Sequence, residues 1–124
     1  MPRVNQRSLA RFFRDASQAR RIHAAVERAV DSIGPATERI TKSQVAFRRR
    51  VAFAWTWLPQ RYLGSSAGTT VLSISLRRRD DSPRWKEIVQ PTKGRVMHHL
   101  ELSRVSEVDA EVRAWLAEAW EAAG

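Results

Sequence analysis

Two stretches of the chain repeat apolar residues every three or four positions, which predicts two amphipathic helices. The first runs from about Asp15 to Ile33, and Gly34-Pro35 ends it because proline cannot continue a helix. The second follows residues 106–109, where serine and acidic side chains are typical of a helix N-terminus. Each predicted helix carries one apolar stripe, which has to pack against another part of the fold.

Between these helices the apolar period changes to two, which predicts β-strands. The alternation covers residues 45–58, and we expect Arg48-Arg49-Arg50 to form a turn between two strands. Residues 69–76 and 96–102 alternate in the same way, 59–68 is typical of a loop, and 85–89 is too short to assign. The pattern predicts an α+β fold: an N-terminal helix, an antiparallel sheet of three to four strands and a C-terminal helix. Both helices pack on the sheet, and the simplest arrangement puts them on one face.

The length of 124 residues fits one domain. We expect residues 1–7 to form a basic, mobile arm and residues 8–124 to form a single α+β domain. Cysteine is absent, which excludes disulfides and cysteine-based zinc sites. No apolar run is long enough to cross a membrane, and no secretory pattern follows the first arginines. We therefore expect a cytoplasmic protein with no membrane partner.

The formal net charge of +9 at pH 7 favours binding to polyanions such as DNA or RNA. If strands 52–58 and 69–76 pair as antiparallel neighbours, Arg48–Arg50 and Arg77–Arg79 meet at one end of the sheet. Arg84 and Lys86 would lie nearby and flank Trp85, so that cations contact phosphates and the indole stacks on a base. The predicted binding residues are Arg48, Arg49, Arg50, Arg77, Arg78, Arg79, Arg84, Trp85 and Lys86. The alternative interpretation is that these arginines form solvated turns.

The pair His98-His99 is the other candidate for chemistry. Neighbouring residues of a strand point to opposite faces, so the two imidazoles cannot easily bind one ion. The third histidine, His23, lies on the first helix, and we predict no metal site and no cofactor. His99 and Glu101 share a strand face, which could orient the imidazole for acid–base catalysis. The alternative is that His98 packs half-buried and His99 lies at the surface.

Several segments of the chain carry a family resemblance: KSQVAFRRR (42–50), FAW (53–55), DSPR (81–84), MHHLEL (97–102) and DAEVRAWL (109–116). They resemble a bacterial, actinobacterial-type domain family of unknown function, some of whose members are labelled putative transport proteins. The resemblance extends from Leu9 to Ala122. Some relatives carry a zinc-finger-like segment and others are joined to nuclease-like domains, so the resemblance implies a preference for nucleic acid.

These observations lead to three hypotheses. The first is a non-enzymatic binding or accessory domain that binds nucleic acid or another polyanion through the arginine triplets. The second is a module that binds a small molecule, a protein partner or a second copy of itself. It would use an apolar sheet face or a cleft lined by Trp55, Trp57 and His98. The third is an enzyme that uses His99 with Glu101.

Overall fold

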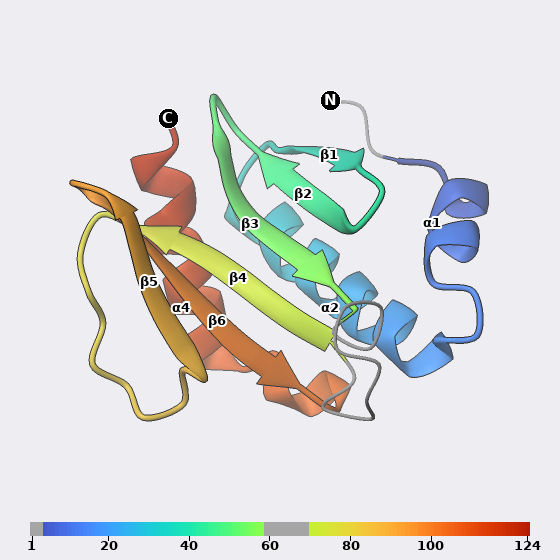
Figure 1. Cartoon of the computed structure of the whole chain (residues 1–124). Coiled ribbons are helices and arrows are strands. Elements are labelled where there is room, and N and C mark those ends of the chain that lie inside the picture. The colour runs from blue at the N-terminus through green and yellow to red at the C-terminus, as the bar shows by residue number, and fades with distance from the viewer. Residues whose placement is uncertain (1–3, 59–69) are drawn as a thin grey trace.

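The structure, a computed structural model, describes residues 4–58 and 70–124 (Figure 1). The elements are α1 (Gln6–Phe12), α2 (Ser17–Ile33), β1 (Thr37–Ile40), β2 (Gln44–Arg48), β3 (Ala52–Trp57), β4 (Thr70–Leu76), β5 (Glu87–Thr92), β6 (Arg95–Leu102), the short 3-10 helix η1 (Val105–Glu107) and α4 (Ala110–Ala122). The described strands form one antiparallel sheet in the order β1-β2-β3-β4-β6-β5. The predicted α+β class, with helices at both ends of the chain, is confirmed.

The two long helices lie on one side of the sheet and contact each other (Figure 1). α2 buries the apolar stripe that its sequence period predicts. It ends at Gly34, where the ring of Trp120 from α4 occupies the space that any larger side chain would need. α4 begins after Asp109, whose carboxylate accepts a hydrogen bond of 3.1 Å from the Val112 N–H. Both apolar stripes therefore cover the same side of the sheet.

Alternation along the strands separates this helix-covered face from an opposite face, which we call the open face. On β4, Leu72 and Ile74 belong to the core beneath the helices, and Leu72 is paired with Leu100 of β6. Ser73 lies between them on the strand and points to the open face. Figure 1 shows no described helix on that face. The side chains of the open face are therefore available to a ligand wherever they are exposed.

A β-bulge interrupts this alternation on β3. Phe47 pairs with Ala54, but Arg48 pairs with Ala52, so Phe53 is an extra residue without a partner on β2. Its side chain is buried in the main core with the residues under the helices. Alternation by itself would place Phe53 on the open face with Trp55. The bulge therefore moves this large ring into the core.

The prediction of three to four strands is wrong, because the sheet has six. The two missed strands, β1 and β5, are the edges of the sheet, where one side of the backbone lacks a neighbouring strand. β5 is mostly exposed and contains Pro91, which cannot donate a backbone hydrogen bond. Edge strands bury few side chains, so neither segment carries the apolar alternation that reveals a central strand.

α1 packs beside the sheet through a second, smaller core of Leu9, Phe12, Phe13, Ala19, Val45 and Leu58. It begins at Gln6 and is capped by Asn5, within the segment that was predicted to be a mobile arm. Residues 1–3 of that arm, and the whole predicted loop 59–68, lie outside the described residues. Among the helices of the described residues, none combines the length and the hydropathy that crossing a membrane requires.

Candidate functional site

The β2–β3 turn and the end of β4 meet beside the C-terminus of α4. Arg49 donates a hydrogen bond of 3.1 Å to the Trp120 carbonyl, and its guanidinium lies 3.5 Å from the centre of that indole ring. Arg77 donates a bond of 3.0 Å to the Ala122 carbonyl. Cations are favoured there because the last carbonyls of a helix carry partial negative charge. Both arginine triplets thus lie at one end of the sheet, as antiparallel pairing of β3 with β4 requires.

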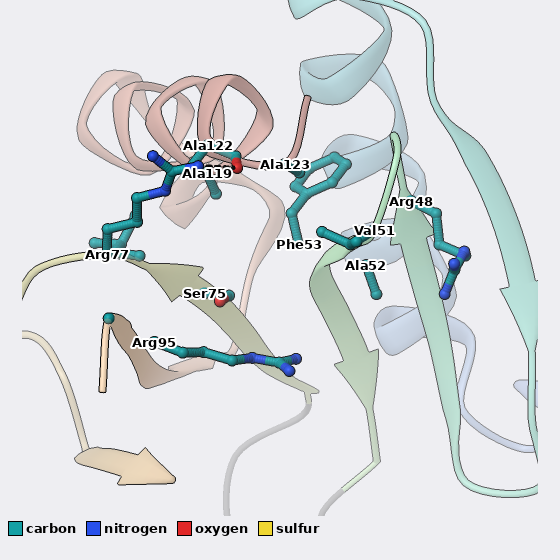
Figure 2. Close-up of a pocket in the computed structure, with 12 residues that line it drawn as sticks. Arg48, Val51, Ala52, Phe53, Ser75, Arg77, Arg95, Ala119, Ala122 and Ala123 are labelled. Atoms are coloured by element: carbon teal, nitrogen blue, oxygen red, sulfur yellow. Dashed lines mark hydrogen bonds between the residues drawn. The ribbon is translucent and has the colours of Figure 1, made fainter. Parts of the chain in front are cut away.

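A cavity of about 400 Å³ opens between the two triplets (Figure 2). Arg48 of β2, Arg77 at the end of β4 and Arg95 at the start of β6 contribute to its lining. In Figure 2 the Arg95 side chain extends past Ser75, while Arg77 points toward α4. We call Arg48–Arg50, Arg77–Arg79 and Arg95 the arginine end. Arg95 was missed in the sequence because it is a single basic residue, and only the pairing of β4 with β6 brings it here.

The arginines that line this cavity carry positive charge that no carboxylate of the described residues neutralises. Within the described part of the chain, no carboxylate forms an ion pair with Arg48, Arg77 or Arg95. Arg78 differs, because it pairs with Glu118 at 2.8 Å and with Asp80 at 3.0 Å. Guanidinium groups that have no carboxylate nearby are suited to bind phosphate or carboxylate groups of a ligand.

Arg84 and Lys86, which were predicted to join this cluster, lie elsewhere. Arg84 binds Asp109 at 3.1 Å and Glu111 at 2.9 Å, at the N-terminal end of α4. Lys86 pairs with Glu101 at 2.6 Å. The reason is the path of the chain after β4: it leaves the arginine end and runs past the N-terminus of α4 before β5 begins. Neither cation lies beside the 400 Å³ cavity.

Trp85 is also placed differently from the prediction. Its side chain is 8% exposed and packs against Trp115 of α4, with 4.1 Å between ring centres. Its indole N–H donates a bond of 2.9 Å to the Asp80 carboxylate. The ring therefore covers the core beneath α4, where burial of a large apolar surface is more favourable than exposure. It offers no free face on which a base could stack.

His98 is a packing residue inside the core. Its ring is fully buried and lies 4.8 Å from the centre of the Trp85 ring. Its Nε2 accepts a bond of 2.9 Å from the Asp80 N–H, and its Nδ1 contacts the Val96 carbonyl at 3.1 Å. Burial lowers the pKa of His98, which is consistent with a neutral ring that donates through Nδ1 and accepts through Nε2. His98 thus lines no cleft with the tryptophans of the opposite face.

The open face carries a chain of hydrogen bonds between aromatic and polar side chains. The Trp57 N–H donates to the Ser73 hydroxyl at 2.9 Å, and this hydroxyl lies 2.7 Å from His99 Nδ1. Burial lowers the pKa of His99, so the neutral ring can accept the hydroxyl proton. Beside them, the Arg95 guanidinium lies 5.8 Å from the centre of the Trp55 ring. Arg95 therefore connects the cavity of the arginine end with the aromatic part of the open face.

The predicted catalytic pair is not joined by a hydrogen bond. Glu101 shares the open face with His99 but binds Lys86, whereas His99 binds Ser73. The prediction from strand alternation that both side chains share one face is correct. Alternation could not predict their hydrogen-bond partners, because these come from β4 and from the segment before β5.

A family model matches residues 10–123, from within α1 to the residue after α4. The chain belongs to DUF5655, a domain of unknown function. The matched region includes the arginine end, the open face and both long helices. Neither a curated protein nor a solved structure matches the chain. For this DUF5655 domain, a functional proposal rests on the geometry of its sites.

A second polar cluster of this DUF5655 domain lies on the helix-covered side. His23 of α2 contacts Thr56 of β3 through Nδ1, at 2.7 Å, and Glu38 of β1 through Nε2, at 2.9 Å. Glu27, one helical turn after His23, lies 3.5 Å from the same Nε2. Burial opposes protonation of His23, but the two carboxylates outweigh it and raise the pKa. The spacing of His23 and Glu27 was visible in the sequence, whereas the approach of Glu38 was not.

Proposed function

We propose that this DUF5655 domain is a non-enzymatic binding domain for single-stranded nucleic acid, and that the strand lies across the open face. The observation that carries the proposal is the cavity lined by Arg48, Arg77 and Arg95, none of which has a carboxylate partner among the described residues. Arg95 also lies over Trp55, so phosphate-binding and base-stacking groups are adjacent.

The phosphates would bind at the arginine end. A guanidinium donates two parallel hydrogen bonds to a phosphate, and release of condensed counterions adds to the affinity. Three arginines around one cavity provide such donors from β2, from the residue after β4 and from β6. The net charge of +9 attracts a polyanion from a distance.

The bases would stack on the open face. Trp55 and Trp57 are both partly exposed there, and the bond from Trp57 to Ser73 holds one indole in a fixed orientation. Stacking on an aromatic ring contributes about 1–3 kcal/mol per base and requires bases that are not already paired. A duplex would hide its bases, so this geometry favours a single strand.

The experiment is fluorescence anisotropy with a labelled poly-dT oligonucleotide and a duplex of the same length. We expect binding to the single strand at about 50 mM salt, with a log–log salt slope near −2 for about three neutralised phosphates. Trp55→Ala should weaken binding by about 1–3 kcal/mol. Trp85→Phe is the matched control, because Trp85 is buried and should not contact the strand. Absence of binding at low salt, or equal binding by the Trp55→Ala variant, would contradict the proposal.

A second candidate function is binding of a small anionic molecule in the cavity alone. The cavity of about 400 Å³ supports it, since ligand pockets commonly have volumes of roughly 300–1,000 Å³. Calorimetry with a nucleoside monophosphate separates the two candidates. Micromolar binding of the mononucleotide, with no gain for a longer strand, would favour the small ligand over the nucleic acid.

A further inference from the structure

The cluster of His23, Glu27 and Glu38 lies on the side of the sheet that the proposed nucleic-acid surface does not use. His23 is 1% exposed, and the Glu38 side chain is fully buried. One ligand atom from each of the three residues lies within 4.8 Å of the others. They come from α2 and from the edge strand β1, so two elements hold them in place. The fold thus brings one imidazole and two carboxylates together in its interior.

The imidazole is oriented as in many metal-binding histidines. Thr56 lies 2.7 Å from Nδ1 and can accept its proton, so that Nε2 faces the carboxylates and can exchange the proton it shares with Glu38 for a metal ion. The rings of Phe13 and Phe47 lie 5.2 and 5.4 Å from the imidazole centre and restrict its rotation. A ligand residue that is held in its binding orientation loses little entropy when an ion binds.

The distances from the imidazole nitrogen to the two carboxylates fit a bound ion. Nε2 of His23 lies 2.9 Å from the Glu38 oxygen and 3.5 Å from the Glu27 oxygen. Ligands at about 2.1 Å from a metal ion lie roughly 3.0 Å apart in octahedral geometry and roughly 3.4 Å apart in tetrahedral geometry. An ion could therefore be bound with small movements of the side chains.

We propose that His23 Nε2, Glu27 and Glu38 bind one divalent transition-metal ion. A donor set of one nitrogen and two carboxylate oxygens suits zinc or manganese better than a soft ion such as Cu(I), which prefers thiolate ligands. Access is provided at Glu27, whose side chain is 18% exposed. With three protein ligands, at least one coordination position stays available to water or an anion.

The test is metal titration of the full chain after treatment with a chelator. We expect one equivalent of Zn²⁺ or Mn²⁺ to bind in calorimetry, Co²⁺ to give visible d–d absorption bands, and one equivalent of zinc to raise the melting temperature. Mg²⁺ should bind at least about tenfold more weakly, because an imidazole nitrogen is a poor ligand for it. Less than half an equivalent of any transition metal bound at 100 µM would overturn the proposal.

Variants locate the ion. Glu27→Gln keeps the shape of a partly exposed residue and should weaken metal binding by at least about tenfold, and Thr56→Val should weaken it by about 10–100-fold through loss of the orienting bond. Glu118→Gln and His99→Asn are the controls, because these residues lie outside the cluster. Circular dichroism shows whether each variant is folded. Full stoichiometric binding by a folded Glu27→Gln variant would also overturn the proposal, whatever the outcome of the oligonucleotide experiments.

Discussion

Basic residues gather near both ends of α4, but their surroundings differ. At the N-terminal end, Arg84 is held by Asp109 and Glu111. At the C-terminal end, Arg48, Arg77 and Arg95 surround a cavity and have no carboxylate partner among the described residues. The same residue type therefore stabilises the fold at one end and is available for a ligand at the other. The number of arginines alone does not distinguish these roles.

The largest expected effect is on oligonucleotide affinity, when positive charges near one end of α4 or the other are replaced by negative ones. Replacing both Arg48 and Arg95 with Glu should weaken oligonucleotide binding by about 100-fold or more at low salt, since two phosphate contacts become repulsive. Arg84→Glu changes the charge in the same direction but lies away from the cavity, so its affinity should stay within a fewfold of the wild type. Anisotropy titrations at one ionic strength measure both. Because the double variant changes the net charge by twice as much, a loss for Arg84→Glu that is half as large on a logarithmic scale would show that only net charge matters.

The next effect concerns stability at the N-terminal end. Asp109→Ala removes the cap of α4 and one partner of Arg84, and it should lower the free energy of unfolding by about 1–2 kcal/mol. Glu111→Ala removes only an exposed pair and should cost about 0.5 kcal/mol or less. Urea denaturation monitored by tryptophan fluorescence measures both changes. A cost for Glu111→Ala as large as that for Asp109→Ala would contradict the role of the cap.

The same carboxylate predicts a dependence on pH. Burial opposes ionisation of Asp109, but hydrogen bonds from the Val112 N–H and Arg84 outweigh it and lower the pKa. A lowered pKa means that the stabilising contribution is present above the unfolded pKa of about 3.9 and is lost as the pH falls through the folded value. Asp109→Asn should therefore show a smaller loss of stability than the wild type between pH 5 and pH 2. Parallel urea curves for the two proteins would contradict this prediction.

The smallest effect on stability is expected at the arginine end. Arg48→Ala should change the free energy of unfolding by less than about 0.5 kcal/mol, because no described residue forms an ion pair with Arg48. Arg77→Ala loses only a bond to the end of α4, worth about 0.3–1 kcal/mol. Thermal denaturation measures both, and oligonucleotide binding should fall in the same variants. A loss above 2 kcal/mol for Arg48→Ala would identify it as a structural residue.

Much of the central fold could be predicted because its signals are local. The helical period of α2, the alternation of β4 and β6, and a turn that includes Arg49 and Arg50 of the first triplet are each visible within about a dozen residues, although Arg48 itself ends β2. The common location of the two arginine triplets also followed, because antiparallel neighbours bring the start of one strand to the end of the next. The edge strands could not be predicted in this way, since they bury little and show weak alternation.

The candidate sites depended on contacts between distant segments. Trp85 is apolar enough to stack on a ligand or to fill the core, and only the position of Trp115 decides for the core. Arg84 could bind a phosphate or a carboxylate, and the N-terminus of α4 provides the carboxylates. Arg95 joins the arginine end only through the pairing of β6 with β4. In each case several chemically similar partners are possible for the side chain. The spacing of apolar residues along the chain does not show which of them lies nearby in the fold.

The amino-acid sequence by itself therefore determined the α+β class, the long helices, the central strands and the end of the sheet where the arginine triplets gather. Only the tertiary structure decided which arginines are paired, that six strands form the sheet, and that Glu38 meets His23 and Glu27. The physical reason is the separation along the chain of the residues that interact. The periods that define helices and strands relate residues a few positions apart, whereas the partner of a charged or polar side chain depends on which remote segment packs beside it.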